Sequence, residues 1–198
     1  MIGGNASDVL PNIDWGVVYD KIGMESEYRQ FCEQNNFVEI PCAWTVPVIA
    51  GVTCNHLMAV FNYLNIRVCK YAYDLDKEVT TKEVRGKSYV VRFRRRIDAD
   101  VENADCSAVD LISRYHRGMA PKEWFLLDLG CFLTFKCHLD SGNSTTICPN
   151  FLFPDKTIPG LDWDSSMRVI TIFGYEIKEC QDGILRSRTA FLHKIPAH

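Results

Sequence analysis

The sequence lacks the short motifs that mark several common enzyme classes. Its 198 residues contain no GxxxxGK(S/T) phosphate loop, no GxGxxG dinucleotide-binding turn, no HExxH helix and no GxSxG turn. These absences argue against nucleotide hydrolysis, Rossmann-type redox chemistry and zinc proteolysis. We therefore expect no cofactor, and we expect the protein to act through its surfaces.

Long apolar runs are also missing. No stretch reaches the roughly 18 apolar residues that a transmembrane helix needs. The N-terminus, MIGGNASDVLPNIDW, has neither the basic region nor the apolar region of a signal peptide. We accordingly expect an intracellular protein whose nine cysteines are reduced thiols.

The paired-cysteine spacing of zinc sites is absent as well. Cys131, Cys137, His138 and Cys148 have the residue types that suit zinc, in the order C-x5-C-H-x9-C. Structural zinc sites usually contain two cysteines separated by about 2–4 residues, because that tight turn directs both thiolates at one point. We predict no metal site.

The composition is that of a globular protein, with 47% apolar and 24% charged residues. It predicts a single domain over residues 1–198, with a helical or irregular N-terminal segment over 1–36. The net charge is −3 but is unevenly spread: residues 1–60 hold two basic and seven acidic groups, whereas residues 61–100 hold ten and six. Such asymmetry favours head-to-tail self-association or local anion binding, so we expect a homo-oligomer.

Two segments show the 0, 3, 4, 7 apolar spacing of an amphipathic helix. The first, 53–64, follows Thr53 as a candidate N-cap, and the second, 105–117, follows Asp105 and ends before Gly118. The apolar positions are Leu57, Val60, Phe61 and Leu64 in the first, and Ala108, Leu111, Ile112 and Tyr115 in the second.

Other segments indicate strands. Residues 88–101 alternate with period two, and 124–138 form a nearly continuous apolar run that we interpret as a buried strand with a kink or bulge at Gly130. Residues 139–165, rich in turn formers, are predicted to be a long loop or arm. Asp182-Gly183 between two alternating runs predicts a C-terminal β-hairpin. The fold class is therefore α+β: a mostly antiparallel twisted sheet with the two helices packed on one face.

The strand over 88–101, SYVVRFRRRIDADV, carries four arginines that are the candidate anion-binding or partner-binding residues. Arg92, Arg94 and Arg96 share one face at about 6.6 Å spacing, close to that of successive phosphates on one nucleic-acid strand. The alternative is a solvated sheet face opposed by carboxylates on a neighbouring strand. Arg95 falls on the apolar face and needs a polar partner or a sheet edge.

Cys54 supports an alternative, enzymatic interpretation. It lies in the first turn of the predicted helix 53–64, where the helix dipole lowers a thiol pKa and where cysteine hydrolases place their nucleophile. His116 is the candidate base, and His138 is a second choice. The other interpretation of Cys54 is a small buried thiol without a catalytic role.

The second half of the chain, about residues 88–198, resembles the matrix proteins of rhabdoviruses. The resemblance follows the order of a basic strand, a helix ending in Tyr115-His-Arg-Gly118 and an apolar segment over Trp124–Phe132, followed by the closing segment DWDSSMRVITIFGYEIKECQDGILRSRTAFLHK. It implies a non-enzymatic viral structural protein that self-associates, contacts the nucleocapsid and bridges it peripherally to a membrane. The implied locations are the virion and the host cytoplasm or nucleus.

Three alternatives remain open at the level of sequence. Besides a matrix-like protein, the chain fits a lattice-forming coat or occlusion protein, or an RNA-binding suppressor of silencing that uses the arginines of 88–101. The third alternative is a cysteine hydrolase that uses Cys54 and His116. They predict, respectively, ordered self-assembly, salt-sensitive RNA binding and selective reactivity of one thiol.

Overall fold

The structure, a computed structural model, describes residues 10–35, 40, 42–81, 86–114, 117–178 and 183–193. The helices are α1 (Trp15–Ile22), α2 (Glu25–Gln34), α3 (Cys54–Tyr63), α4 (Leu75–Glu78), α5 (Ala108–Ser113) and α6 (Pro121–Phe135), with a 3-10 turn over Val101–Asn103. The strands are β1 (Ala43–Val48), β2 (Arg67–Lys70), β3 (Thr80–Thr81), β4 (Tyr89–Arg94), β5 (Thr145–Ile147), β6 (Phe151–Leu152), β7 (Ile158–Asp164), β8 (Val169–Tyr175), β9 (Leu185–Arg186) and β10 (Phe191–His193).

These strands form two main sheets. One has the order β1-β4-β10 and is antiparallel throughout; the other has the order β2-β8-β7-β5-β9 and is antiparallel in its centre, with parallel pairs at both edges. A short β3-β6 pair and an isolated antiparallel bridge between Gly118 and Thr189 add to this pairing. The predicted α+β class with mostly antiparallel pairing is confirmed.

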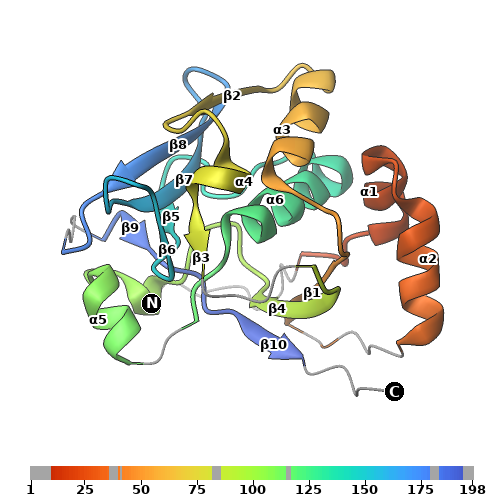
Figure 1. Cartoon of the computed structure of the whole chain (residues 1–198), viewed down its shortest axis with the longest axis horizontal. Coiled ribbons are helices and arrows are strands. Elements are labelled where there is room, and N and C mark those ends of the chain that lie inside the picture. Colours follow the sequence, from red (N-terminus) through yellow and green to blue (C-terminus); the bar gives the residue numbers. More distant parts are fainter. Residues whose placement is uncertain are drawn as a thin grey trace, which may run out of the picture.

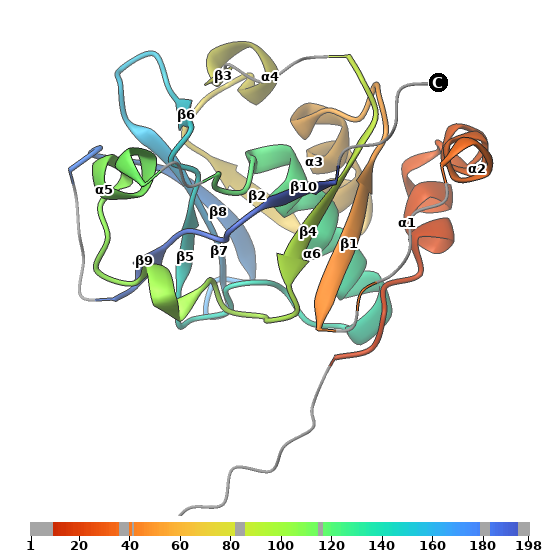
Figure 2. The same cartoon turned by 90° about the horizontal axis from the view of Figure 1, so that it is seen from below.

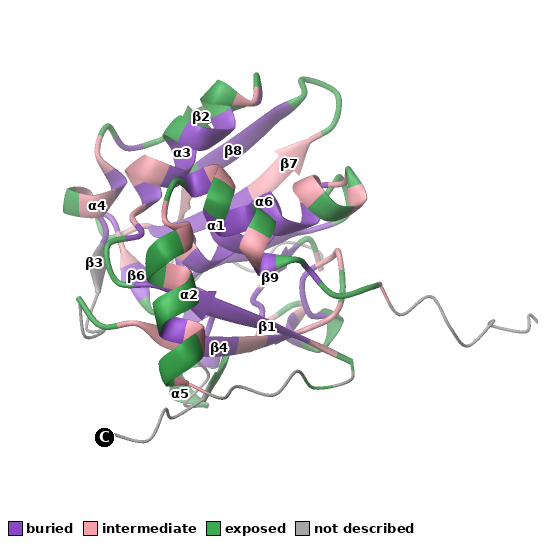
Figure 3. Ribbon diagram, turned by 90° about the vertical axis from the view of Figure 1, so that its right-hand side faces the viewer, coloured by how far each residue is buried: buried purple, intermediate pink, exposed green. Residues whose placement is uncertain are grey.

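Helix α6 occupies the centre of the molecule. It contacts β1 of one sheet and β7 of the other, and α1 and α3 pack against it from further sides (Figures 1 and 2). Its buried side chains join those of β1, β4, α1 and α3 in one large hydrophobic cluster. Figure 3 accordingly shows β1 and much of β4 as buried, whereas α2 at the surface is largely exposed.

The prediction of a buried strand over 124–138 is wrong, because most of this run belongs to α6. Pro121 begins the helix at its first position, where the missing N–H has no partner to lose. The helix is apolar on all sides because both sheets and two helices surround it, and periodicity does not separate such a helix from a buried strand. Gly130 does not form a bulge. It allows Ile13 to pack closely against the helix, because a Cβ at this position would lie 2.8 Å from Ile13 Cγ2.

The predicted loop or arm over 139–165 is also wrong, because it contains β5, β6 and β7. The strands β5 and β6 are too short to show an alternation in the sequence. Strand β7 contains Pro159 and Gly160, residue types that are depleted in strands. Gly160 is required by packing, since a Cβ there would lie 2.4 Å from the Tyr175 ring.

The first predicted helix is confirmed as α3, whose N-cap Thr53 accepts a hydrogen bond from His56 N at 3.1 Å. The second is shorter than predicted, because Ser107 caps α5 in a reciprocal pair with Asp110. Asp105 has a φ of 59°, outside the extended region that an N-cap adopts. The two helices do not share one face: α3 packs in the large cluster, and α5 packs in a second cluster on the other face of the five-stranded sheet.

A C-terminal strand pair is present, as predicted, but with a different partner. The hairpin joins β7 and β8, in register from Ile158 opposite Tyr175 to Asp164 opposite Val169. The strands after Gly183 pair elsewhere, β9 with β5 and β10 with β4. Asp182 of the predicted turn lies outside the described residues.

Candidate assembly surface around β4 and β10

The four candidate arginines lie on β4 and directly after it, because the strand predicted over 88–101 ends at Arg94. Arg92 lies opposite Thr45 of β1 and Phe191 of β10, so these three residues share one row across the sheet. Arg95 and Arg96 follow the strand. The structure therefore places only two of the three predicted face-sharing arginines on a strand face.

Carboxylates compensate two of the arginines. Arg94 Nη1 lies 3.3 Å from Asp100 Oδ2 and 3.2 Å from Glu102 Oε2, and Arg96 Nη1 lies 2.9 Å from Glu102 Oε2. Hydrogen bonding from its own backbone N–H and the nearby Arg96 and Arg94 hold the pKa of Glu102 below its usual range. The carboxylates come from the segment after β4, and not from a neighbouring strand as the sequence-based alternative had it.

Arg95 has polar partners for both terminal nitrogens of its guanidinium, whereas its buried Nε has none within the described residues. Its guanidinium donates to the carbonyl of Leu10 at 2.9 Å and that of Ala43 at 3.1 Å, and it also donates to Asn12 Oδ1. The prediction that Arg95 needs a partner is confirmed. Its role is to fix the segment before α1 onto the start of β1, which leaves it poorly placed to bind an external anion.

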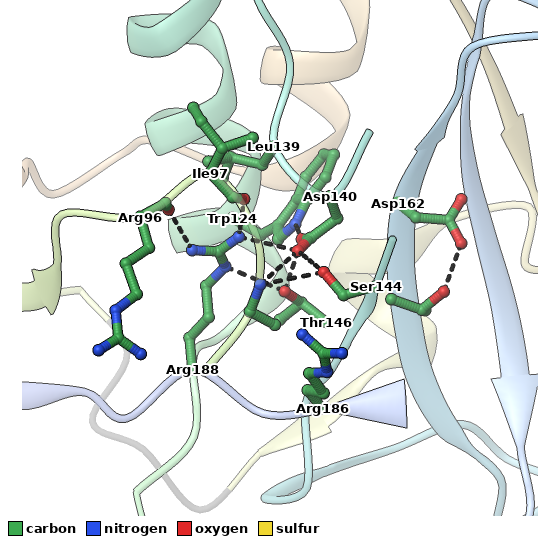
Figure 4. A network of polar contacts seen from close by, with 12 residues as sticks. Arg96, Ile97, Trp124, Leu139, Asp140, Ser144, Thr146, Asp162, Arg186 and Arg188 are labelled. Atoms are coloured by element: carbon green, nitrogen blue, oxygen red, sulfur yellow. Dashed lines mark hydrogen bonds and ion pairs between the residues drawn. The ribbon is translucent and has the colours of Figure 1, made fainter. Parts of the chain in front are cut away.

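A fifth arginine, which sequence analysis did not identify, lies beneath the chain segment that follows β4. Arg188 is 2% exposed and donates to four acceptors, which are Thr146 Oγ1 at 3.0 Å, Asp140 Oδ1 at 2.8 Å, the carbonyl of Arg96 at 2.8 Å and the carbonyl of Ile97. Figure 4 shows that Arg96 joins this network through its backbone, while its guanidinium points away.

Asp140 is the acceptor at the centre of the same network. Its carboxylate is fully buried and also accepts hydrogen bonds from Ala99 N, Trp124 Nε1, Ser144 Oγ and Thr146 Oγ1, at 2.6 to 2.9 Å (Figure 4). The network joins the segment after β4 to β5 and α6. It therefore holds residues 92–96, called the arginine segment below, in place. All acceptor positions of the buried Asp140 carboxylate are occupied by hydrogen-bond donors.

Cys54 is not arranged as an activated nucleophile. It is 7% exposed, and burial together with Asp76 raises the pKa of its thiol well above the usual range. The Asp76 carboxylate accepts from Cys54 N at 2.8 Å and so occupies the start of α3. His116, the candidate base, lies outside the described residues.

The residues considered for zinc are engaged in packing. Cys131 and Cys148 are buried, and His138 Nδ1 lies 2.8 Å from Asp128 Oδ2. The His138 ring is stacked between Phe132 and Trp163, at centroid distances of 5.0 and 3.8 Å. Across the part of the chain that the structure describes, no three His, Cys, Asp or Glu side chains are grouped as metal ligands.

The edge of the three-stranded sheet carries exposed apolar side chains. Within the described residues β10 itself pairs with β4 alone, and Figures 1 and 2 show it at the margin of the sheet; directly before β10, Thr189 forms an antiparallel bridge with Gly118. Phe191 and Leu192 of β10 are 53% and 54% exposed, although consecutive strand residues point to opposite faces. The alternation around these residues predicted a strand, but nothing in the sequence identified it as an edge.

Comparison with protein-family models, curated proteins and solved structures finds no match to this chain. No helix among the described residues has the length and apolar character to cross a membrane. The resemblance to rhabdovirus matrix proteins, and the virion and host-cell locations that it implies, stay predictions.

Proposed function

We propose that this chain is a non-enzymatic structural protein that self-associates through the open edge of β10. The observation that carries the proposal is the pair of exposed apolar residues, Phe191 and Leu192, on that edge strand. Natural proteins usually protect an edge strand with charges, prolines or a covering segment, because its unpaired N–H and C=O groups offer a template for another strand.

A second copy of the chain is the partner that fits this edge most simply. Two β10 strands in antiparallel pairing are related by a two-fold axis, so both subunits contribute the same surface to the contact. The pairing would extend the β1-β4-β10 sheet across the axis and bury Phe191 and Leu192 on its two faces. Assembly beyond a dimer would then need a second contact. Attraction between the acidic residues 1–60 of one copy and the basic residues 61–100 of another could supply it.

The arginine segment gives the proposed assembly a route to an anionic partner, nucleocapsid RNA or a membrane surface. Arg92 lies in the same row as Phe191, next to the proposed contact. Arg94 and Arg96 are held by Glu102, so an anion must displace that carboxylate to reach them. Self-association is thus the first element of the proposal. Anion binding is the second element, and we expect it to be weaker and sensitive to salt.

Light scattering coupled to size-exclusion chromatography tests the proposal. We expect the wild-type chain to form dimers or larger species as its concentration rises, and Leu192→Lys to remain a monomer, because a charge on the edge opposes strand pairing. Phe173→Lys is the matched control, since Phe173 is 45% exposed on β8 of the other sheet. This variant should assemble like the wild type.

Two results would end the proposal: a wild-type chain that stays monomeric at every concentration, or a Leu192→Lys variant that assembles normally. Circular dichroism should show the same unfolding temperature for Leu192→Lys and the wild-type monomer, because the side chain is exposed and its loss removes no core contact.

A further inference from the structure

A cavity of about 290 Å³, partly open to solvent, lies where α3 and α6 both begin, and residues of α4 and β6 also line it. The residues of β4 and β10 take no part in it, so it is separate from the proposed assembly surface. Its volume lies just below the range for small-molecule sites, about 300–1,000 Å³. A ligand that fits it is therefore small.

Part of the cavity wall is apolar. Val52, Leu75, Val79 and Phe151 line it and are otherwise buried in the large hydrophobic cluster. Cys54 lies among them, and burial keeps its thiol protonated, so that it acts as a small apolar group. These walls suit the hydrocarbon part of a ligand.

The charged groups of the cavity are two lysines and one aspartate. Both oxygens of Asp76 are engaged at the start of α3, where they accept from Cys54 N at 2.8 Å and Asn55 N at 2.9 Å. Lys87 and Lys122 also line the cavity, and neither is in a salt bridge within the described residues. The charged residues that line the cavity, all within the described part of the chain, therefore sum to one positive charge.

Lys122 is placed where an anion is favoured for a second reason. It lies in the first turn of the 15-residue helix α6, at the positive end of the helix dipole. Its Nζ is 5.2 Å from the centroid of the Tyr89 ring, a cation–π contact that orients the ammonium without neutralising it.

From the cavity, the apolar part of its wall and its two lysines, we propose that this site binds a small carboxylic acid with an apolar chain or ring. The carboxylate would accept hydrogen bonds from Lys122 and Lys87, and the apolar part would lie against Val52, Leu75 and Phe151. A single negative charge matches the net charge of the site, whereas a phosphate dianion exceeds it.

An NMR titration of the ¹⁵N-labelled full chain with hexanoate tests this site. We expect saturable shift changes at the amides of Val52, Leu75 and Lys122. Hexanol, which has a similar apolar body and no charge, should bind more weakly by about ten-fold or more, because a charge-assisted hydrogen bond is lost. Acetate should also bind more weakly, by about four-fold for each buried methylene that it lacks.

Variants separate specific binding from general contact with the surface. Lys122→Met should raise the Kd for hexanoate about ten-fold or more and leave that for hexanol unchanged. Lys178→Met, at an exposed lysine outside the cavity, is the matched control and should bind hexanoate like the wild type. The proposal is overturned if hexanoate causes no saturable change, if hexanol binds equally well, or if Lys122→Met binds hexanoate with unchanged Kd.

Discussion

Replacement of Arg188 by methionine is expected to lower the free energy of unfolding by about 3–5 kcal/mol, the range for breaking a buried ion pair by removal of one partner. The variant keeps most of the volume of the side chain but removes all four hydrogen bonds of the guanidinium. It leaves the buried Asp140 carboxylate without a cation and removes a donor from the carbonyls of Arg96 and Ile97, of which the second keeps Asp140 N at 3.1 Å. Urea unfolding followed by tryptophan fluorescence measures the change.

Arg186→Met is the matched control for this experiment. Arg186 lies two residues earlier, is half-buried and donates to the carbonyl of Gly183, so its loss should cost less than about 1 kcal/mol. If Arg188→Met also costs less than about 1 kcal/mol, Asp140 does not depend on this cation. The double variant Asp140→Asn, Arg188→Met should be more stable than the sum of the two single effects predicts, because the two side chains contact each other.

The sequence predicted those elements whose local signals agree with one another. Helix α3 has a capping threonine and four apolar residues on one face, and the structure contains it with nearly the predicted ends. Strand β4 was predicted from its alternation, but the alternation continued past Arg94 because the chain turns there without a change in polarity. The error over 124–138 has another cause, since a helix surrounded by both sheets shows no polar face.

The polar residues of the site show the same division. Arg95 was recognisable as an anomaly, because an arginine on an apolar strand face must have a partner. Arg188 lies in the apolar run around β9 and β10 and presents the same anomaly, but its partner Asp140 is 48 residues away in the sequence. A pairing over that distance depends on tertiary structure. The cavity between α3 and α6 was equally inaccessible, because α6 was not recognised as a helix.

Glu123→Gln is expected to lower the free energy of unfolding by about 3 kcal/mol, the lower end of the range for a broken buried ion pair, because Arg117 retains some contact with solvent. The Glu123 side chain is 0% exposed and accepts from four donors: Arg117 Nη2 at 2.7 Å and Nη1 at 3.3 Å, Tyr89 OH at 2.7 Å and Ala120 N at 2.9 Å. A glutamine has the same shape, but its NH2 group must face some of these donors.

The same substitution connects stability with the proposed ligand site. Glu123 fixes the start of α6, and Lys122 is the residue before it, so a displaced first turn should weaken hexanoate binding as well as lower stability. Glu123→Asp keeps the charge but shortens the side chain, and it should recover part of the stability if the charge matters more than the reach. Equal unfolding free energies for Glu123→Gln and the wild type would mean that α6 begins without this ion pair. Urea unfolding and the hexanoate titration, carried out on the same three proteins, measure the two effects separately.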